Sequence, residues 1–309
     1  MGLYKINSEN VAQRVKNDTL DYESSFEDWL ENTPSLLFDD DSSETLLWIG
    51  RQATATVGGG AKHPDLIGID ADGDLVIVEL KRGKTPRDII AQILEYASWG
   101  HDLDYENLNN MYLKYAEEST NSLLETFMAL FELETNIKED YFNKKQKLFI
   151  VAEKIDPIVN QVSNYLCEVY KMNINHLEYE VMKTEQQELI ISVKKSFGYV
   201  RAVIPQEGSA DKWSGEKLVD LVHDAVISLV GQSGKTFAIR DVDKMLVAKF
   251  PTINTSSVNC RIMQDCVNHG SRRHWPSGQK DYYYLIEKGK YRLYDSSTDG
   301  KWNWEGRKI

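Results

Sequence analysis

The sequence predicts an α/β protein with a mixed sheet flanked by helices, followed by a smaller α+β module. Apolar stretches at 66–69 and 75–80 flank an Asp-Ala-Asp-Gly turn. This pattern is typical of a β-hairpin, because glycine accepts a positive φ. Strand-like and helix-like segments then alternate at 147–152, 157–170 and 177–181, and such a strand–helix–strand unit extends a sheet.

Length and charge divide the chain into two parts. With 309 residues, it is longer than one typical core requires. We expect a first domain at 1–204, a linker at 205–213 and a second domain at 214–309. Residues 1–213 hold 21 Lys and Arg against 37 Asp and Glu, whereas the remainder holds 15 against 11. The net charge of −12 is therefore unevenly distributed, and the basic second part is the better candidate for phosphate contact.

Composition excludes several classes of protein. No stretch approaches the ~18 apolar residues of a membrane span, and the start lacks the apolar core of a signal peptide. The three cysteines, Cys167, Cys260 and Cys266, are no disulfide framework, which fits a reducing compartment. We expect a cytoplasmic protein with no membrane partner.

The first 60 residues prepare the hairpin. Residues 1–20 are polar, and their pattern fits either a strand or a loose segment. A helix is expected from Ser24, with Ser24 or Ser25 as its N-cap and an apolar side at Phe26, Trp29 and Leu30. A strand is expected at 46–49. The glycines of 56–60 fit a flexible loop or a hairpin turn equally well.

Helices and strands are expected to alternate after the hairpin. Thr85-Pro86 opens a helix with proline in its first turn. Two further helices are expected around 105–118 and 121–134, and a last strand at 189–193.

Three charged side chains converge at one end of the predicted hairpin. Asp65 precedes its first strand, while Glu79 and Lys81 lie near the end of the second. Residues two apart on a strand face the same side. Two acids buried without a partner are costly, and a divalent cation such as Mg²⁺, with Mn²⁺ as a substitute, would neutralise them. The alternative is a surface ion pair on a hairpin.

The spacing of Pro64-Asp65 and Glu79-Leu80-Lys81 resembles the PD-(D/E)xK nuclease superfamily. Gln92 and Tyr96 form the Q-x-x-x-Y of its RecB-like branch, and Glu27 occupies the place of that branch's first-helix acid. The segment that includes Arg51-Gln52 and continues through the hairpin is similar to the nuclease domain of NucS (EndoMS) enzymes. The resemblance covers residues 20–195 and implies a restriction-endonuclease-like fold.

The resemblance also implies roles. Asp65 and Glu79 would hold Mg²⁺, and Glu27 would assist through the metal or its water shell. Lys81 would orient the attacking water. Gln92 and Tyr96 would order the site and the DNA strand, and Arg51 and Gln52 would contact DNA. A contact on the helix surface is the alternative for Gln92 and Tyr96.

The last hundred residues resemble a winged helix. Helices are expected at 215–230, 240–250 and 255–267, with a short strand at 236–239 and a hairpin at 282–294. In a helix–turn–helix the second helix enters the major groove. Here that helix is 255–267. The expected DNA contacts are Asn259 and Arg261 on it and, in the basic segment that follows, Arg272, Arg273 and His274. A protein-binding module is the alternative.

Zinc is disfavoured at Cys260, Cys266, His269 and His274. Residues six apart on a helix point about 120° away from each other, so the two cysteines do not converge. The two cysteines are better explained as small side chains buried in the core.

The sequence therefore predicts a metal-dependent DNA endonuclease. NucS enzymes carry their DNA-binding domain before the nuclease, whereas the extra domain follows it here. A restriction-like or phage-defence role is expected in place of mismatch repair. The alternatives are a repair nuclease and a non-enzymatic DNA-binding or adaptor protein on a nuclease fold. DNA is the expected partner, and the sequence leaves open whether the chain forms a homodimer.

Overall fold

The computed structural model describes residues 3–6, 8, 10–18, 23–38, 44–53, 55–57, 60–117, 119–133, 137–197, 217–231 and 236–309. The predicted linker at 205–213 lies outside these residues. The elements of the N-terminal part are β1 (Tyr4–Ile6), β2 (Ala12–Arg14), β3 (Lys16–Asp18), α1 (Glu23–Asn32), η1 (Pro34–Leu37), β4 (Leu46–Arg51), β5 (Ala55–Val57), β6 (Gly60–Lys62), β7 (Leu66–Asp70), β8 (Leu75–Lys84), α2 (Ile89–His101), α3 (Tyr105–Tyr115), α4 (Leu123–Leu130), η2 (Glu139–Tyr141), β9 (Gln146–Lys154), α5 (Pro157–Tyr170), β10 (Ile174–Lys183) and β11 (Leu189–Phe197).

The C-terminal part is smaller. Its elements are α6 (Leu218–Val230), α7 (Ile239–Lys249), α8 (Thr255–Gln264), η3 (Gly270–His274), β12 (Tyr283–Glu287), β13 (Lys290–Leu293) and α9 (Ser296–Asp299). Helices α6, α7 and α8 pack around a core of their own together with the β12–β13 hairpin. Phe237 forms a single bridge to Tyr291.

A mixed sheet organises the N-terminal part, as predicted. Its strand order is β11-β10-β9-β8-β7-β4, and β3 pairs with β10. Strands β8, β9 and β10 are parallel neighbours, whereas β4, β7 and β11 run antiparallel to theirs. The β7–β8 hairpin turns at Gly73, whose φ is 77, a conformation that glycine adopts without a steric penalty.

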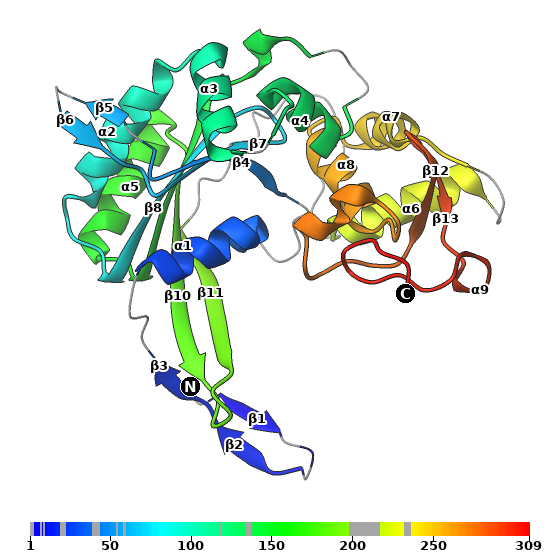
Figure 1. The fold of residues 1–309 in the computed structure, drawn as a ribbon, viewed down its shortest axis with the longest axis horizontal. Coiled ribbons are helices and arrows are strands. Elements are labelled where there is room, and N and C mark those ends of the chain that lie inside the picture. The colour runs from blue at the N-terminus through cyan, green and yellow to red at the C-terminus, as the bar shows by residue number, and fades with distance from the viewer. Residues whose placement is uncertain are drawn as a thin grey trace.

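Helices cover both faces of the sheet (Figure 1). Alternate residues of a strand point to opposite faces. Ile67, Ile69 and Ile77 pack on the face covered by α2, α3, α4 and α5. Leu66 and Val78 join the cluster with Phe26 and Leu30 of α1 on the other face. This arrangement brings α1 and α2 to the same hairpin from opposite sides.

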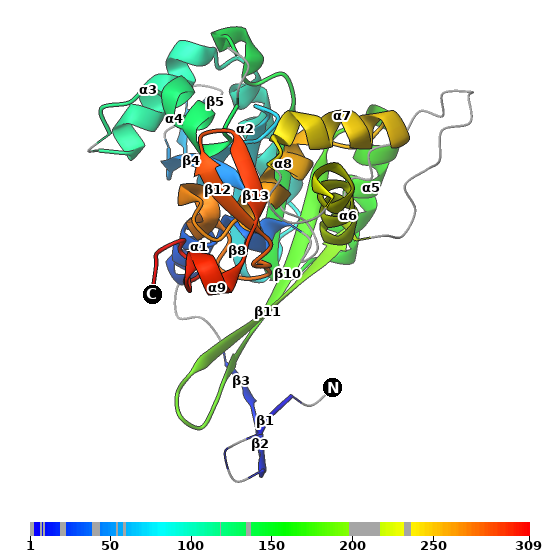
Figure 2. The same cartoon turned by 90° about the vertical axis from the view of Figure 1, so that its right-hand side faces the viewer.

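Strands β10 and β11 project beyond the body of the molecule, and β1, β2 and β3 lie along their far end (Figure 2). The antiparallel pairing of β3 with Val181–Lys183 attaches this N-terminal segment to the projecting hairpin.

The C-terminal part packs against the turn of the β7–β8 hairpin and the end of α4. Asn254 Nδ2 donates to Asp72 Oδ2 at 3.2 Å, and Ser271 Oγ donates to the Leu130 carbonyl at 3.0 Å. Cys260, Met263 and Trp275 belong to the same buried cluster as the core of the N-terminal part.

Several boundaries differ from the sequence-based expectations. Helix α1 begins at Glu23, so Ser24 and Ser25 lie inside it and do not cap it. Helix α2 begins at Ile89 after a turn, so Pro86 precedes the helix. The strand expected at 236–239 is reduced to one bridge because α7 already begins at Ile239. Strands β5 and β6 pair antiparallel, which favours the hairpin reading of 56–60.

Candidate active site

Asp65 and Glu79 lie side by side at the end of the hairpin opposite its turn. Leu66 pairs with Val78 in the antiparallel register, which places the two acids at the next position. Both are buried, with 8% and 1% of their surfaces exposed. The Leu80 N–H donates to Asp65 Oδ2 at 2.7 Å. Glu79 Oε2 is buried and has no hydrogen-bond partner among the described residues. One carboxylate oxygen is therefore available for a cation.

Lys81 and helix α2 enclose Glu79 from the other side. Lys81 Nζ lies 2.6 Å from Glu79 Oε1 and donates to the Leu80 carbonyl at 2.9 Å. Gln92 Nε2 contacts the same Glu79 oxygen and lies 3.0 Å from the Tyr96 hydroxyl. That hydroxyl donates to the His63 carbonyl at 3.2 Å. The Q-x-x-x-Y pair thus reaches the acids, and is not confined to a helix-surface contact.

Helix α1 and strand β4 complete the cluster. Glu27 is 5% exposed. Gln52 Nε2 lies 3.3 Å from Glu27 Oε1 and 3.0 Å from Asp65 Oδ1, so one amide joins the two carboxylates. Arg51 makes ion pairs with Glu27 at 3.1 Å, with Asp28 at 2.7 Å and with Glu31 at 2.8 Å.

These contacts argue against the DNA-contact role expected for Arg51 and Gln52. Three carboxylates already engage the Arg51 guanidinium, and Gln52 is directed to the acids. Gln52 has a φ of 48, which is uncommon for a residue with a Cβ and is found at functional sites. The Gln52 bridge between Glu27 and Asp65 has no signature in the sequence, because it depends on how α1 meets β4.

The pKa values of the two hairpin acids are raised. Burial raises the pKa of Asp65 to about 6, although the Leu80 N–H and Lys81 oppose the rise. Burial and the neighbouring charge of Asp65 raise the pKa of Glu79 to about 8. Two carboxylates this close do not both ionise readily near neutral pH without a cation. The site therefore fits a hard cation with oxygen ligands.

A second acidic cluster lies at the turn of the same hairpin. Asp70, Asp72 and Asp74 carry carboxylate oxygens within 4.8 Å of one another, and in the described part of the chain this is the one group of three ligands so close. Glu27, Asp65 and Glu79 are less tightly grouped. The sequence signal for the second cluster is the D-x-D-G-D spacing of residues 70–74. The sequence analysis interprets this segment only as a turn.

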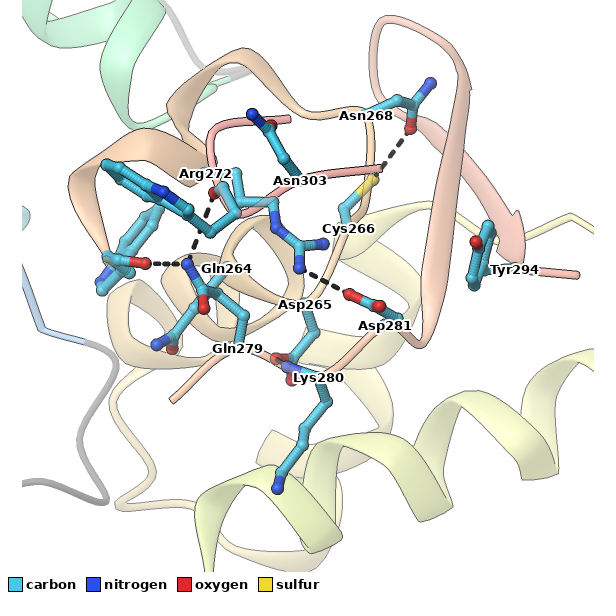
Figure 3. A network of polar contacts seen from close by, with 12 residues as sticks. Gln264, Asp265, Cys266, Asn268, Arg272, Gln279, Lys280, Asp281, Tyr294 and Asn303 are labelled. Carbon is cyan, nitrogen blue, oxygen red and sulfur yellow. Dashed lines mark hydrogen bonds and ion pairs between the residues drawn. The ribbon is translucent and has the colours of Figure 1, made fainter. Parts of the chain in front are cut away.

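The DNA-binding residues expected in the C-terminal part are mostly turned inward. Arg261 is 3% exposed and pairs with Asp265, with Nε to Oδ2 at 2.7 Å. Arg272 is 4% exposed, and Figure 3 shows it directed at Asp281, with Nη2 2.5 Å from Oδ1. Burial in these pairs argues against DNA contact by either arginine.

The other three expected DNA contacts, Asn259, His274 and Arg273, differ in their exposure and partners. The Asn259 amide, in its better-bonded orientation, donates to Asp243 and to the Thr255 carbonyl at 3.1–3.2 Å. His274 is half-buried, and burial lowers its pKa to about 4. Arg273 is exposed. Of the five expected contacts, Arg273 is the one that faces solvent freely.

The helix expected to enter the groove is itself covered. Val258, Cys260, Ile262 and Met263 of α8 are fully buried, and Ser256 Oγ lies 3.5 Å from the Ala71 carbonyl. The helix ends at Gln264, three residues earlier than expected. Its N-terminal end faces the β7–β8 turn, so a groove-reading role for α8 is not supported.

A serine–histidine–asparagine series lies within the sheet core. Ser163 Oγ is 2.9 Å from His176 Nε2, and His176 Nδ1 is 2.6 Å from Asn160 Oδ1. Ser163 and His176 are both 0% exposed, so no substrate reaches the hydroxyl. Burial lowers the pKa of His176 to about 4. The series therefore fixes α5 to β10, and it is no nucleophilic triad.

Comparison with known proteins finds a match for part of the chain. Residues 219–293, inside the predicted second domain, match a family described as a domain of unknown function (DUF7669). No curated protein matches the chain, and no solved structure does. None of the helices in the described residues is long and apolar enough to span a membrane.

Proposed function

We propose that this protein is a metal-dependent DNA endonuclease of the PD-(D/E)xK type with a restriction-endonuclease-like N-terminal domain. The observation that carries the proposal is the meeting of Asp65, Glu79 and Lys81 at one end of a hairpin, with Gln92 and Tyr96 around them. Asp65 directly precedes β7, and the other residues come from β8 and α2, in the order that the resemblance implies.

Asp65 and Glu79 are the residues that would hold Mg²⁺ or Mn²⁺. The metal would supply Lewis-acid stabilisation of the phosphoryl group and a more acidic bound water. The residues of the chain do the rest. Lys81 orients the attacking water and stabilises negative charge that develops on the phosphoryl oxygens. Gln92 and Lys81 fix the Glu79 carboxylate, and Gln52 fixes Asp65 against Glu27.

Hydrolysis forms a bond between water oxygen and phosphorus and breaks the bond to the 3′ oxygen, which takes up a proton. The products expected are a 3′-hydroxyl and a 5′-phosphate. We propose a restriction-like or phage-defence role for this nuclease, because its extra domain follows the nuclease domain and does not precede it as in NucS enzymes.

We propose a winged-helix-like fold for the C-terminal part, with α6, α7, α8 and the β12–β13 hairpin in that order. Its positive balance favours DNA binding. Because α8 packs against the N-terminal part, the DNA-binding surface is proposed to lie on another face, where Arg273 is exposed.

The test is a cleavage panel with the purified full chain. Plain, modified, mismatched and single-stranded DNA are incubated with Mg²⁺, Mn²⁺ or EDTA. Asp65→Asn, Glu79→Gln and Lys81→Met should each abolish cleavage, and Glu168→Gln on the exposed side of α5 is the control. Wild-type cleavage rates in the Asp65 and Glu79 variants would refute the proposed site. A wild-type chain inactive on every substrate with either metal would refute the function.

A further inference from the structure

The turn of the β7–β8 hairpin and the C-terminal part enclose a second acidic site. A cavity of ≈ 10 Å³ lies between them, about the size that one water or ion occupies. Glu44, Thr45, Asp70 and Asp72 line it from the N-terminal part, and Ser257 is among the residues that line it from α8. Asp70, at the end of β7, lies five positions after Asp65, a span of about 17 Å in an extended strand, so this site is separate from the proposed active site.

Four carboxylates gather at and beside this cavity. Asp70, Asp72 and Asp74 hold their oxygens within 4.8 Å of one another. Asp70, Asp72 and Glu44 line the cavity, whereas Asp74 lines the adjoining open pocket. Lys147 Nζ lies 2.5 Å from Asp70 Oδ2. Lys195 also acts on Glu44, and Lys145 acts on Asp74. Three lysines and the positive N-terminal end of α8 therefore face four carboxylates.

A buried hydroxyl supports a ligand independently of the acids. Thr45 is 1% exposed, and its Oγ1 has no hydrogen-bond partner among the described residues. Buried polar groups are almost always paired. Because Thr45 lines the cavity, an occupant with an attraction for oxygen would satisfy both the hydroxyl and the carboxylates.

The donor atoms indicate the class of occupant. Carboxylates and a hydroxyl are hard oxygen ligands, which Ca²⁺ takes in irregular, six- to eight-fold geometries, whereas Mg²⁺ demands a near-ideal octahedron. Cys260 also lines the cavity, but burial and the charge of the neighbouring acids raise the pKa of its thiol. A protonated thiol is a poor ligand for a soft metal such as zinc.

The cavity adjoins an open pocket. An open pocket of ≈ 370 Å³ shares Asp72 and Asn254 with it, and Asp74, Lys144 and Thr252 are also in its lining. Asn254 links the two parts of the chain, because its Nδ2 donates to Asp72 while its Oδ1 caps α8 through the N–H groups of Ser256 and Ser257. An ion on Asp72 would therefore stabilise this contact.

We propose that Glu44, Thr45, Asp70, Asp72 and Asp74 bind a hard divalent cation, with Ca²⁺ preferred over Mg²⁺, that fastens the C-terminal part to the hairpin turn. The ion acts on structure and not on phosphodiester chemistry. Its binding does not depend on the proposed nuclease activity.

The experiment uses the full chain, stripped with EDTA and desalted. Thermal unfolding is measured with CaCl₂ or MgCl₂, and Tb³⁺ luminescence is excited through tyrosine. Tyr141 is well placed as the donor, since its hydroxyl lies 3.4 Å from the Ala71 carbonyl. A rise in Tm of several degrees with Ca²⁺, a smaller rise with Mg²⁺, and Ca²⁺-displaceable Tb³⁺ luminescence are expected.

Two sets of variants locate the ion. Asp72→Asn, Asp74→Asn and Thr45→Val should each weaken Ca²⁺ affinity, the two acid variants by at least tenfold. The double variant Asp65→Asn/Glu79→Gln should retain the full response, and Glu168→Gln should match the wild type. Absence of any Ca²⁺-dependent shift and of displaceable luminescence would overturn the proposal, with Lys147 as the sufficient counter-ion. A response kept in both Asp72→Asn and Asp74→Asn, or lost in the double variant, would also overturn it.

Discussion

The Leu80 N–H holds Asp65 Oδ2 at 2.7 Å, so the first acid of the hairpin is fixed by the strand that carries the second. A backbone donor cannot be removed by changing a side chain. The relative position of Asp65 and Glu79 is therefore a property of the hairpin register, and the side chains around it tune their charge and orientation.

Gln52 should matter for activity although it is not charged. Gln52→Asn tolerates the positive φ, because asparagine is enriched in that region, but its amide is too short to join Glu27 and Asp65. Loss of a group that orients metal ligands typically costs about 10–100-fold in metal affinity or activity. We expect a loss of that size in cleavage rate, partly recovered at high Mg²⁺ or Mn²⁺.

A matched control is available in Gln187, which also has a positive φ, 67, and lies exposed in the β10–β11 turn. Gln187→Asn should cleave at the wild-type rate. If Gln52→Asn behaved like Gln187→Asn, the amide bridge would have no part in organising the acids.

Arg261 should be required for stability and not for DNA binding. Arg261→Met leaves the Asp265 carboxylate, 1% exposed, without its guanidinium partner. Removing one member of a buried pair costs about 3–5 kcal/mol. Denaturant unfolding of the full chain should show this loss, while Arg273→Met at an exposed position should leave stability unchanged. Equal stability of the two variants would reopen a DNA-contact role for Arg261.

His176 should make the protein sensitive to acid. Its pKa falls from 6.5 in the unfolded chain to about 4 in the fold because of burial. Between these values the unfolded state binds a proton that the folded state refuses, so stability falls as pH drops from 6.5 towards 4. The loss approaches about 1.4 kcal/mol per pH unit. Urea unfolding between pH 4 and 7 measures it, and His176→Gln should flatten the dependence if the variant folds.

Glu79 should have the opposite dependence in metal-free protein. Its pKa is about 8 in the fold against 4.5 unfolded, so the folded state keeps a proton that the unfolded state has released. Stability in EDTA should therefore fall as pH rises from 4.5 to 8. Glu79→Gln should remove this fall, and Mg²⁺ should reduce it in the wild type. A wild-type profile that is identical with and without Mg²⁺ would contradict a metal on this acid.

The contact between the two parts of the chain can be tested at Glu132. His269 Nε2 lies 2.6 Å from Glu132 Oε1, and the Tyr291 hydroxyl donates to the other oxygen. His269 and the tyrosine hydroxyl lower the pKa of Glu132, although burial opposes them. Tyr291→Phe removes one donor without changing the ring. Hydrogen exchange at 130–133 and 268–272 should rise in this variant, whereas Tyr165→Phe on the exposed side of α5 should leave it unchanged.

Local sequence patterns were enough to predict the hairpin and its charged residues. The D-A-D-G turn, the branched strand and the spacing of Glu79 and Lys81 all lie within twenty residues. Helix α5 also begins and ends where predicted, because Asp156 caps it and Pro157 suits its first turn. Such features depend on neighbours along the chain, and not on distant contacts.

The predicted DNA contacts of the C-terminal part were weaker, because they depended on which side chains are exposed to solvent. The start of α8 is polar, with Asn254 and Ser256. Such side chains suit a DNA groove, and they equally suit the β7–β8 turn of the N-terminal part, where they contact Asp72 and Ala71. Composition cannot separate these, because both environments offer anionic or carbonyl acceptors. The i,i+4 spacing of Arg261 and Asp265 does contain a signal for an internal pair, which competes with the DNA contact expected for Arg261.

The buried cluster that joins Cys260, Met263 and Trp275 to the sheet core has a practical consequence for dividing this chain. A fragment ending before residue 217 would expose to water the apolar surface that these three side chains cover, and large patches of that kind promote aggregation. Co-expression of both fragments, so that each covers the other during folding, is the appropriate route to soluble halves.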